Sequence, residues 1–529
     1  MAQPISFSRR DFLKLGLVGG ALLGAPMTIP RPARALSPQL ERFQQPLRIP
    51  PELSPVRSDA TTDYYEIRVH KAIAEVLPGR QTEIWGYNGL YPGPTIRQQG
   101  GKRDDGGRQS VVRFINELGQ DNQGEDISTV THLHGMASLP QYDGFAEDLI
   151  RPGYFKDYIY PNDRAATIWY HDHAIDKTSR NVYRGLAGMY IVEDQFERDL
   201  PLPKGPYDVP LILQDAFFAN DGHMVFDDRG QRSLYGDVAL VNGVPWPHMS
   251  VANRKYRFRI LNASGSRSYN LTLSRDEKRL TLGETLFVIG SDGGLLGEPV
   301  ELKTPYQVLE IGMAERYEVI IDFSRYPVGS SVYLKNLGFT GSIDTDDRIH
   351  TLMRFDITRE EPDDSQLPDT LRPVNRLSAE DAGRTRTFRF SRNLNRWVIN
   401  NQEWNPNVAI ADPGTGDVEI WELVNPGSGW FHPVHIHLID MQMLDRNGLP
   451  PRPYERGWKD VFHVGEFETV RVIGKFGTRD GTYINGQYMM HCHNLVHEDH
   501  SMMTTFEIGM NGSDPMSAPA LPISEMRSL

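Results

Sequence analysis

The sole cysteine of the chain, Cys492, lies between two histidines in residues 490–502. His497 follows Cys492 by five residues, and Met502 follows it by ten. A thiolate, imidazoles and a thioether form the ligand set that favours copper in a trigonal site of two histidines and one cysteine, with a weak axial methionine. We therefore interpret this segment as a candidate copper site built around Cys492.

The histidines on either side of Cys492 indicate a second metal site. Alternate side chains of a β-strand point to opposite faces, so Cys492 would face one metal while His491 and His493 face another. The thiolate would then connect two metal centres through a short covalent path.

Three further segments, at 131–135, 169–173 and 432–437, each contain two histidines separated by one residue. Strand periodicity places both imidazoles of such a pair on one face. Ten of the 16 histidines fall in the four clusters, namely His132, His134, His171, His173, His432, His435, His437, His491, His493 and His497. One pair alone would be typical of a surface or structural zinc contact. Four pairs, one of them flanking the sole cysteine, argue against that simpler interpretation.

In the order and spacing of these clusters, and in residues 89–95 (Gly-Leu-Tyr-Pro-Gly-Pro-Thr), the chain resembles the multicopper oxidases. The resemblance covers essentially the whole chain after its leader. It implies four copper ions, of which one is type 1, one is type 2 and two are type 3. It implies that the type 1 copper is held by His432, Cys492 and His497, with Met502 axial. It implies that the type 2 copper is held by His132 and His435, and the type 3 pair by His134, His171, His173, His437, His491 and His493.

The elements that would position these residues are strands. The 48 glycines and 37 prolines suit a turn-rich all-β protein. A weak repeat at 87–89, 241–243 and 399–401 is followed each time by an alternating segment that ends in asparagine, at 111–116, 256–262 and 418–425. Similar runs occur at 317–323 and 467–473. We expect three β-sandwiches, which the resemblance specifies as Greek-key cupredoxin domains.

The repeat predicts a domain order. We expect domain 1 at 36–195 with trinuclear-site histidines, domain 2 at 196–358 without copper ligands, a linker at 359–383, and domain 3 at 384–529 with the remaining ligands. Residues 268–273 of the middle copy contain no histidine where the third copy has His435 and His437. The middle copy is therefore interpreted as a spacer, and the trinuclear site is expected between domains 1 and 3. The segment after Gly509 is rich in glycine, serine and proline, and we expect it to be loosely ordered.

The first 35 residues have the features of a twin-arginine signal peptide. Arg9 and Arg10 precede an apolar stretch at 15–25 that is too short to span a bilayer, and residues 33–35 (Ala-Arg-Ala) offer a cleavage site. We expect export by the twin-arginine route to the periplasm or the medium, with no membrane anchor after cleavage.

Charge and cysteine content exclude several classes of partner and link. The formal net charge of the whole chain is −13, and loss of the basic leader makes the mature chain more acidic, which argues against nucleic acid or anionic membrane as a partner. A single cysteine excludes an intramolecular disulfide, and copper ligation gives the lone thiol a purpose. We expect a monomer whose partners are O2 and a small reducing substrate.

Three residues outside the ligand set match positions that the family uses. Glu498, beside His497, and Asp143, nine residues after His134, match acidic positions near the trinuclear cluster, where they would relay protons or serve as structural hydrogen-bond acceptors. Trp430, two residues before His432, resembles the bilirubin-oxidase branch, and the alternative is an aromatic packed against the site.

The expected function is oxidation of phenolic or tetrapyrrole substrates coupled to reduction of O2 to water. One alternative is a Cu(I) oxidase for copper tolerance, but residues 338–380 contain a single methionine where that branch has a methionine-rich insertion. Another is a non-catalytic exported cupredoxin-type protein, although such members have lost ligands and this chain has all of them. Nitrite reduction is set aside, because it would involve two domains and no His-Cys-His connection to a trinuclear site.

Overall fold

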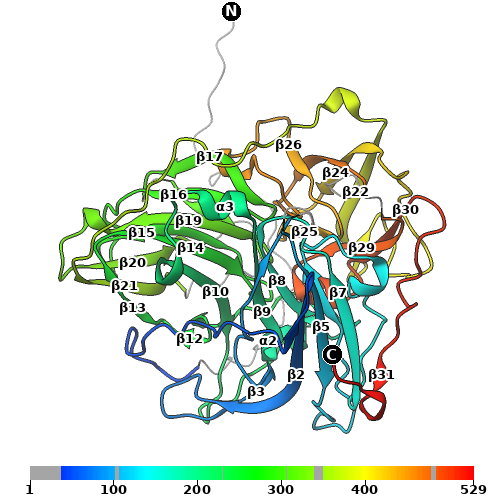
Figure 1. The fold of residues 1–529 in the computed structure, drawn as a ribbon, viewed down its shortest axis with the longest axis horizontal. Coiled ribbons are helices and arrows are strands. Elements are labelled where there is room, and N and C mark those ends of the chain that lie inside the picture. The colour runs from blue at the N-terminus through cyan, green and yellow to red at the C-terminus, as the bar shows by residue number, and fades with distance from the viewer. Residues whose placement is uncertain (1–36, 102–105, 229, 305–306, 339–348, 478–483) are drawn as a thin grey trace, which may run out of the picture. The chain divides into compact units, whose positions relative to one another are not determined.

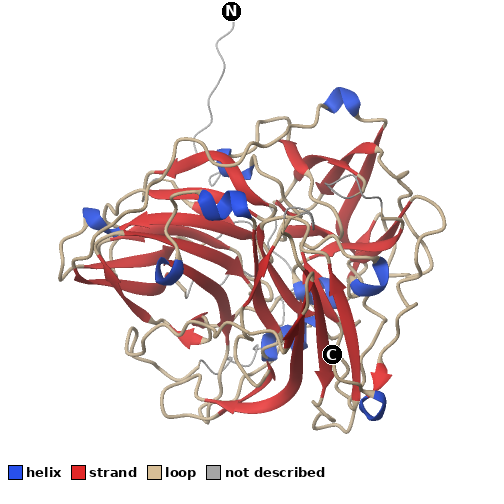
Figure 2. Ribbon diagram, viewed as in Figure 1, coloured by secondary structure: helices blue, strands red, loops and turns tan. Residues whose placement is uncertain are grey.

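The computed structural model describes residues 37–529 except 102–105, 229, 305–306, 339–348 and 478–483. The expected leader lies outside the described residues. Strands dominate the described chain (Figure 2), and its α-helices are the short segments α2 (Thr178–Arg184), α3 (Gln195–Asp199) and α4 (Leu495–Asp499). None of the helices in these ranges is long and apolar enough to cross a membrane. The all-β fold class expected from the sequence is confirmed.

Within the described ranges the strands form six sheets, which follow one another along the chain in pairs (Figure 1). The first pair consists of a sheet with β1 (Arg57–Ser58), β2 (Thr62–Ala74), β3 (Thr82–Tyr87), β5 (Gln109–Asn116), β7 (Tyr154–Tyr160) and β31 (Leu521–Pro522), and a sheet ordered β4 (Ile96–Gln99), β9 (Ala187–Glu193), β8 (Ala166–Asp172) and β6 (Thr131–His134).

The second pair contains a seven-stranded and a five-stranded sheet. The larger sheet is ordered β12 (Val244–Pro245), β11 (Val238–Val241), β10 (Asp208–Ala216), β14 (Lys255–Asn262), β19 (Arg316–Asp322), β16 (Leu286–Ser291) and β17 (Gly294–Leu302). The smaller is ordered β13 (His248–Ala252), β21 (Thr351–Arg359), β20 (Ser331–Asn336), β15 (Tyr269–Ser274) and β18 (Leu309–Ile311).

The third pair carries the C-terminal histidine clusters. Its larger sheet is ordered β23 (Arg396–Ile399), β22 (Arg384–Asn393), β24 (Val418–Asn425), β28 (Glu468–Lys475) and β26 (Gln442–Arg446). Its smaller sheet is ordered β27 (Val461–Val464), β25 (His432–Ile436), β29 (Gly486–Cys492) and β30 (Met503–Ile508). We call the three pairs the first, second and third sandwich. The exact domain boundaries given above stay predictions.

The internal repeat corresponds to one strand arrangement used three times. In each sandwich a strand pairs in parallel with the predicted alternating strand, which in turn pairs antiparallel with a third strand; the three sets are β2-β5-β7, β10-β14-β19 and β22-β24-β28. The strands predicted at 111–116, 256–262 and 418–425 are the central members β5, β14 and β24.

The repeated asparagine has a physical reason at each turn. Asn88, Asn242 and Asn400 adopt left-handed backbone conformations with φ of 54°, 50° and 52°. Asparagine tolerates this region better than most residues because its short side chain can bond to the local backbone. Each Oδ1 accepts a hydrogen bond at 2.7–2.8 Å from a backbone N–H of the neighbouring strand. The same turn therefore recurs in all three sandwiches.

The C-terminal segment differs from the expectation. Strand β31 pairs with β7, with Leu521 opposite Phe155, so the chain returns to the first sandwich after completing the third. The prediction of a loosely ordered tail was wrong, because composition alone does not reveal an open strand edge that a short segment can cover.

Each sandwich has its own apolar core, and a fourth cluster lies where the three sandwiches meet. That cluster combines Trp169 of β8, Leu261 of β14, Val461 of β27 and Leu495 of α4 with further apolar side chains of the first and second sandwiches, all buried. This close-packed apolar junction joins all three sandwiches, and it therefore fixes the strands that carry the histidine clusters relative to one another.

Candidate metal centre

The four histidine clusters lie on neighbouring strands of two sheets. In the first sandwich β6 pairs with β8, which sets His132 opposite His171. In the third sandwich β25 pairs with β29, which sets His435 opposite His491 and Val434 opposite Cys492. Cys492 and His491 are consecutive in a strand, so their side chains point to opposite faces, as the sequence predicted.

Cys492 forms one group with two histidines. Its Sγ lies 3.4 Å from Nδ1 of His432 and 3.7 Å from Nδ1 of His497, and all three side chains are buried. Met502 is also buried and belongs to the same apolar cluster as Cys492. Its N–H donates to the carbonyl of His497 at 3.0 Å, and its own carbonyl accepts from the N–H of Cys492 at 3.1 Å. His432 and His497, two of the predicted type 1 ligands, therefore lie around the thiol of Cys492, and Met502 is tied to Cys492 and His497 through its backbone.

The other eight histidines form a second group, with no side chain more than 1% exposed. Four come from the first sandwich and four from the third. Within the group, ligand atoms converge as His134 with His171 and His493, as His173 with His437 and His491, and as His132 with His435 and His134. The Nε2 atoms of His132 and His435 lie 3.2 Å apart. The first two of these groups together contain the six histidines that the resemblance assigns to the type 3 pair, and the third contains His132 and His435, which it assigns to the type 2 copper.

The ring nitrogens of this group fit a metal cluster. Nε2 of His491 lies 3.1 Å from Nε2 of His173 and 3.2 Å from Nε2 of His437, which is close for neutral acceptors unless a cation lies between them. Nδ1 of His134, Nε2 of His171 and both ring nitrogens of His493 are buried without a hydrogen-bond partner. Buried polar atoms are normally satisfied, so these converging nitrogens are explained by metal ligation.

Backbone carbonyls and carboxylates fix which nitrogen of each ring faces inward. Nδ1 of His171 donates to the carbonyl of Asp172 at 2.8 Å, Nδ1 of His435 to the carbonyl of Asp460 at 2.9 Å, and Nδ1 of His437 to the Asp143 carboxylate at 2.7 Å. These contacts leave Nε2 free as a ligand atom. His134 is reversed, because its Nε2 donates to the Asp460 carboxylate at 3.0 Å and leaves Nδ1 inward.

The two predicted carboxylates both lie at this group, in different electrostatic states. Burial raises the pKa of Asp143 well above its ordinary range. Burial alone would also raise the pKa of Glu498, but His491 and His173 outweigh it and lower that pKa to about 2. Glu498 Oε2 lies 3.1 Å from His491 Nδ1, and Oε1 lies 3.6 Å from His173 Nδ1. The pKa shifts of the two carboxyl groups therefore have opposite directions, upward for Asp143 because of burial and downward for Glu498 because of the neighbouring imidazoles.

Trp430 lies at the outer side of the cysteine group. Its ring is partly exposed and meets the buried Trp397 edge-on, with centroids 5.2 Å apart at 89°. Trp397 in turn stacks on His497 with centroids 3.6 Å apart at 26°, while Trp430 is edge-on to His497 at 5.6 Å. Arg392 lies over both indole rings, at 5.0 Å from Trp397 and 5.9 Å from Trp430.

Sequence reasoning missed three residues that contact the candidate ligands. Trp397 stacks on His497, and Asp460 accepts a hydrogen bond from His134. Asp172 holds the turn after His171, because its carboxylate accepts from the N–H groups of Val130 at 3.0 Å and Ala174 at 3.1 Å. Asp172 could have been singled out because it lies inside the His-Asp-His motif. Trp397 and Asp460 are far from their partners along the chain and carry no local signal.

The cysteine of the first group is well shielded from solvent. Burial raises the pKa of the Cys492 thiol well above its ordinary value. A soft cation would be needed to deprotonate it, as metal coordination of a thiol does.

The six histidines outside the four clusters belong to none of the ligand groups found in the described ranges.

Known proteins resemble this chain over most of its length. Residues 68–197 and 372–511 match two family models, each described as multicopper oxidase. The chain is 40% identical over 494 residues to the bilirubin oxidase of Albifimbria verrucaria, covering 89% of this chain and 82% of that protein. It is 34% identical over 533 residues to the laccase of Bacillus subtilis (strain 168), covering 89% and 99%. The crystal structure of McoA multicopper oxidase from Aquifex aeolicus is similar with a TM-score of 0.78 at 30% identity, covering 89% and 100%.

Proposed function

Since this chain belongs to the multicopper oxidase family, we propose that it oxidises phenolic or tetrapyrrole substrates one electron at a time and passes the electrons to O2, which is reduced to water. Three cupredoxin domains and a copper cofactor are common to this chain and that family. The observation that carries the proposal is the run His491-Cys492-His493, whose cysteine belongs to one ligand group and whose histidines belong to the other.

We assign the ligands as the resemblance implies them. His432, Cys492, His497 and Met502 would hold type 1 copper, and the eight other clustered histidines would hold the type 2 and type 3 ions. The chemistry that copper supplies when bound is one-electron transfer from the substrate and four-electron reduction of O2. The chain contributes the covalent path from Cys492 to His491 and His493, which keeps the two sites a fixed short distance apart.

Glu498 and Asp143 are proposed to supply protons to the O2-reducing site. Supporting this role, Glu498 contacts His491 and His173, whereas Asp143 contacts His437 and His132. Carboxyl groups in contact with the histidines of this group can accept and donate protons at the same site. Both are buried, so bulk water does not compete for these contacts.

At the type 1 end, Trp430 is proposed to contact the reducing substrate. It is partly exposed, it touches Trp397, and Trp397 stacks on the ligand His497. An aromatic reductant that packs on Trp430 would thus lie close to the metal site with water excluded from the interface. The likeness to a bilirubin oxidase and a laccase supports an organic reductant.

Oxidation of Cu(I) is the second candidate. It is less favoured because residues 338–380 hold only Met353, so the chain lacks a methionine-rich insertion. A non-catalytic role is the third, and the full set of ligand residues argues against it. We further propose a monomer that is exported by the twin-arginine route to the periplasm or the medium, which the Arg9-Arg10 motif supports.

The test is oxygen uptake by the copper-loaded protein with bilirubin, a simple phenol and Cu(I) offered in parallel. Faster uptake with bilirubin or the phenol is the expected result. Faster uptake with Cu(I) would move the assignment to copper detoxification. A protein confirmed to hold four coppers that consumes no O2 with any of the three would instead favour the non-catalytic role.

A further inference from the structure

Arg316 reaches the histidine group from the second sandwich, which contributes none of its histidines. It begins β19 and is fully buried. Its guanidinium donates to both oxygens of Asp460, with Nη1 2.7 Å from Oδ1 and Nη2 2.6 Å from Oδ2. This is the paired geometry in which arginine binds a carboxylate most strongly.

Asp460 in turn contacts two candidate copper ligands from different sandwiches. Its Oδ1 accepts from Nε2 of His134 at 3.0 Å, and its backbone carbonyl accepts from Nδ1 of His435 at 2.9 Å. The two imidazoles are stacked with centroids 3.6 Å apart and planes 13° apart. One residue therefore sets the orientation of both rings, and its carboxylate is the reason that His134 turns Nδ1 inward.

The Asp460 carboxylate needs a partner to play this part. Its side chain is 2% exposed, and a buried carboxylate is costly unless it is paired and hydrogen-bonded. Arg316 supplies the charge and two N–H donors at once. Without Arg316, the Asp460 carboxylate would lose both of these N–H donors and could rotate toward another donor, which would remove the acceptor that His134 needs.

Arg316 is itself held in place from three directions. Its Nε donates to the carbonyl of Thr167 on β8 at 3.0 Å, Nη2 donates to the carbonyl of Asp292 at 3.1 Å, and its N–H donates to Asp292 Oδ1 at 2.8 Å. Gly135, which follows His134, has φ of +96°, and a Cβ there would lie 2.7 Å from Nη2 of Arg316 and 2.9 Å from Oδ2 of Asp460. The glycine of the His-Leu-His-Gly motif thus leaves room for this ion pair.

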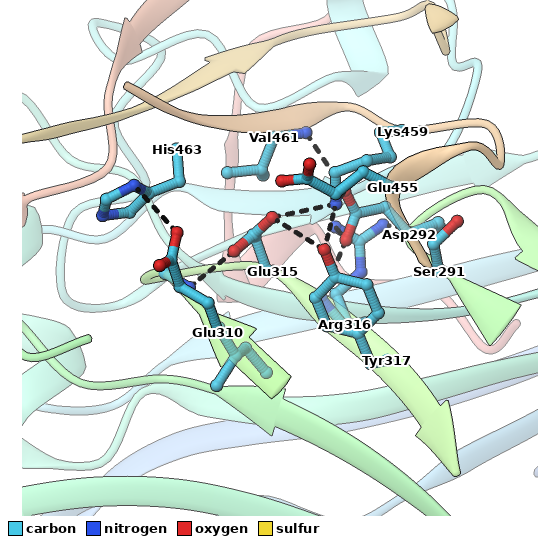
Figure 3. A network of polar contacts seen from close by, with 12 residues as sticks. Ser291, Asp292, Glu310, Glu315, Arg316, Tyr317, Glu455, Lys459, Val461 and His463 are labelled. Carbon is cyan, nitrogen blue, oxygen red and sulfur yellow. Dashed lines mark hydrogen bonds and ion pairs between the residues drawn. The ribbon is translucent and has the colours of Figure 1, made fainter. Parts of the chain in front are cut away.

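A second buried ion pair, formed by Lys459, joins the second and third sandwiches beside Arg316 and Asp460. Lys459, fully buried, donates to Asp292 at 2.7 Å and lies 2.9 Å from Glu315, as Figure 3 shows from close by. Lys459 thus pairs with Glu315, and the next residue, Asp460, pairs with Arg316. Only the Asp460 half of this ion-pair network contacts a histidine of the copper group.

We propose that Arg316 is a positioning residue for the trinuclear copper site, acting through Asp460 on His134 and His435. The second sandwich then has a specific task besides separating the other two. This inference rests on the proposed function, because it takes the eight clustered histidines to be copper ligands.

The test compares Arg316→Met and Arg316→Lys with Lys459→Met as the matched control. Lys459→Met removes an equally buried cation from the same ion-pair network without touching the Asp460 carboxylate or a histidine. For each copper-loaded protein, the blue thiolate absorption reports the type 1 ion, and electron paramagnetic resonance with near-ultraviolet absorption reports the type 2 and type 3 ions. Copper retention is titrated with a competing chelator, and unfolding of the metal-free protein is measured separately.

We expect Arg316→Met to keep the blue absorption and to lose type 2 and type 3 copper at roughly 10- to 100-fold lower chelator concentration, the usual effect of removing such an outer hydrogen-bond partner. Arg316→Lys, which keeps the charge but not the paired geometry, should fold and fall between Arg316→Met and the wild type. Lys459→Met should destabilise the metal-free protein and leave the three copper signals in proportion.

Equal loss of all copper signals in Arg316→Met and Lys459→Met would overturn the inference, because it would reduce Arg316 to a structural ion pair. So would wild-type retention of type 2 and type 3 copper in Arg316→Lys and Arg316→Met. Failure of the proposed function would look different, since the wild-type protein would then either bind no copper at the clustered histidines or hold its copper ions and consume no O2 with an organic donor.

Discussion

The carboxylate of Glu498 lies against His491, with Oε2 3.1 Å from Nδ1 of that imidazole. His491 precedes Cys492, so Glu498 stands next to the covalent connection between the two candidate copper sites. Glu498 lies in α4 directly after the ligand His497, and its side chain is buried. The Glu498 carboxylate thereby lies beside the site where electrons and protons would be combined with O2.

Replacing Glu498 with glutamine should slow O2 reduction while leaving the type 1 site intact. The amide keeps the size of the side chain but cannot accept and release a proton. We expect Glu498→Gln to retain the blue absorption and to be reoxidised by O2 roughly 100-fold more slowly, the order of magnitude of a general acid-base contribution. Stopped-flow mixing of the reduced protein with O2 measures this rate, and Glu125→Gln, an exposed carboxylate, is the control. Wild-type reoxidation by Glu498→Gln would remove Glu498 from the mechanism.

Trp430 should affect organic substrates rather than the copper sites. Loss of an aromatic contact costs about 1 kcal/mol, or roughly fivefold in rate. We expect Trp430→Ala to lower kcat/KM for bilirubin and phenols by about that factor, with the blue absorption unchanged. Trp404→Ala, which alters another partly exposed indole that contacts Glu147, should have wild-type kinetics. Equal kinetics for the Trp430 and Trp404 variants would show that Trp430 is only a packing residue.

Cys492 should be separable from the histidine group. Cys492→Ser removes the thiolate but alters none of the eight histidines that converge on the other side of the strand. We expect this variant to lose the blue absorption and substrate oxidation and to retain type 2 and type 3 copper by electron paramagnetic resonance and metal analysis. Loss of all copper from Cys492→Ser would mean that the two groups form as one unit.

Glu310 should make folding stability depend on pH. It lies on β18, and burial, which outweighs Arg452 and Arg446, raises its pKa from 4.5 to about 7. The folded protein thus binds this proton more tightly than the unfolded chain does. The stability that protonated Glu310 contributes is complete below about pH 4.5 and is lost as pH rises through 7, by roughly 3 kcal/mol at most.

Glu310→Gln removes that titration. We expect its free energy of unfolding, measured on the metal-free protein, to gain on that of the wild type steadily from pH 5 to pH 8. Glu301→Gln, an exposed residue on β17 of the same sandwich, should follow the wild-type curve. Parallel curves for Glu310→Gln and wild type would show that Glu310 does not titrate in this range.

The histidine clusters could be singled out from the sequence because their spacing is short-range. His-x-His pairs on strands, and the asparagine turns at 88, 242 and 400, encode local geometry that strand pairing then brings together. The contacts of Arg316 with Asp460 and of Asp460 with His134 span 144 and 326 residues, and nothing local marks them. The stacking of Trp397 on His497 is equally non-local. Such contacts depend on how the sandwiches pack, which motif spacing does not encode.

The most direct test of the account is the stoichiometry of O2 consumption by the copper-loaded protein with a one-electron organic donor in excess. We expect four donor equivalents to be oxidised for each O2 consumed, with no hydrogen peroxide released, and no turnover in Cys492→Ser. Two equivalents for each O2 with accumulation of peroxide, or the same turnover in Cys492→Ser as in the wild type, would contradict it.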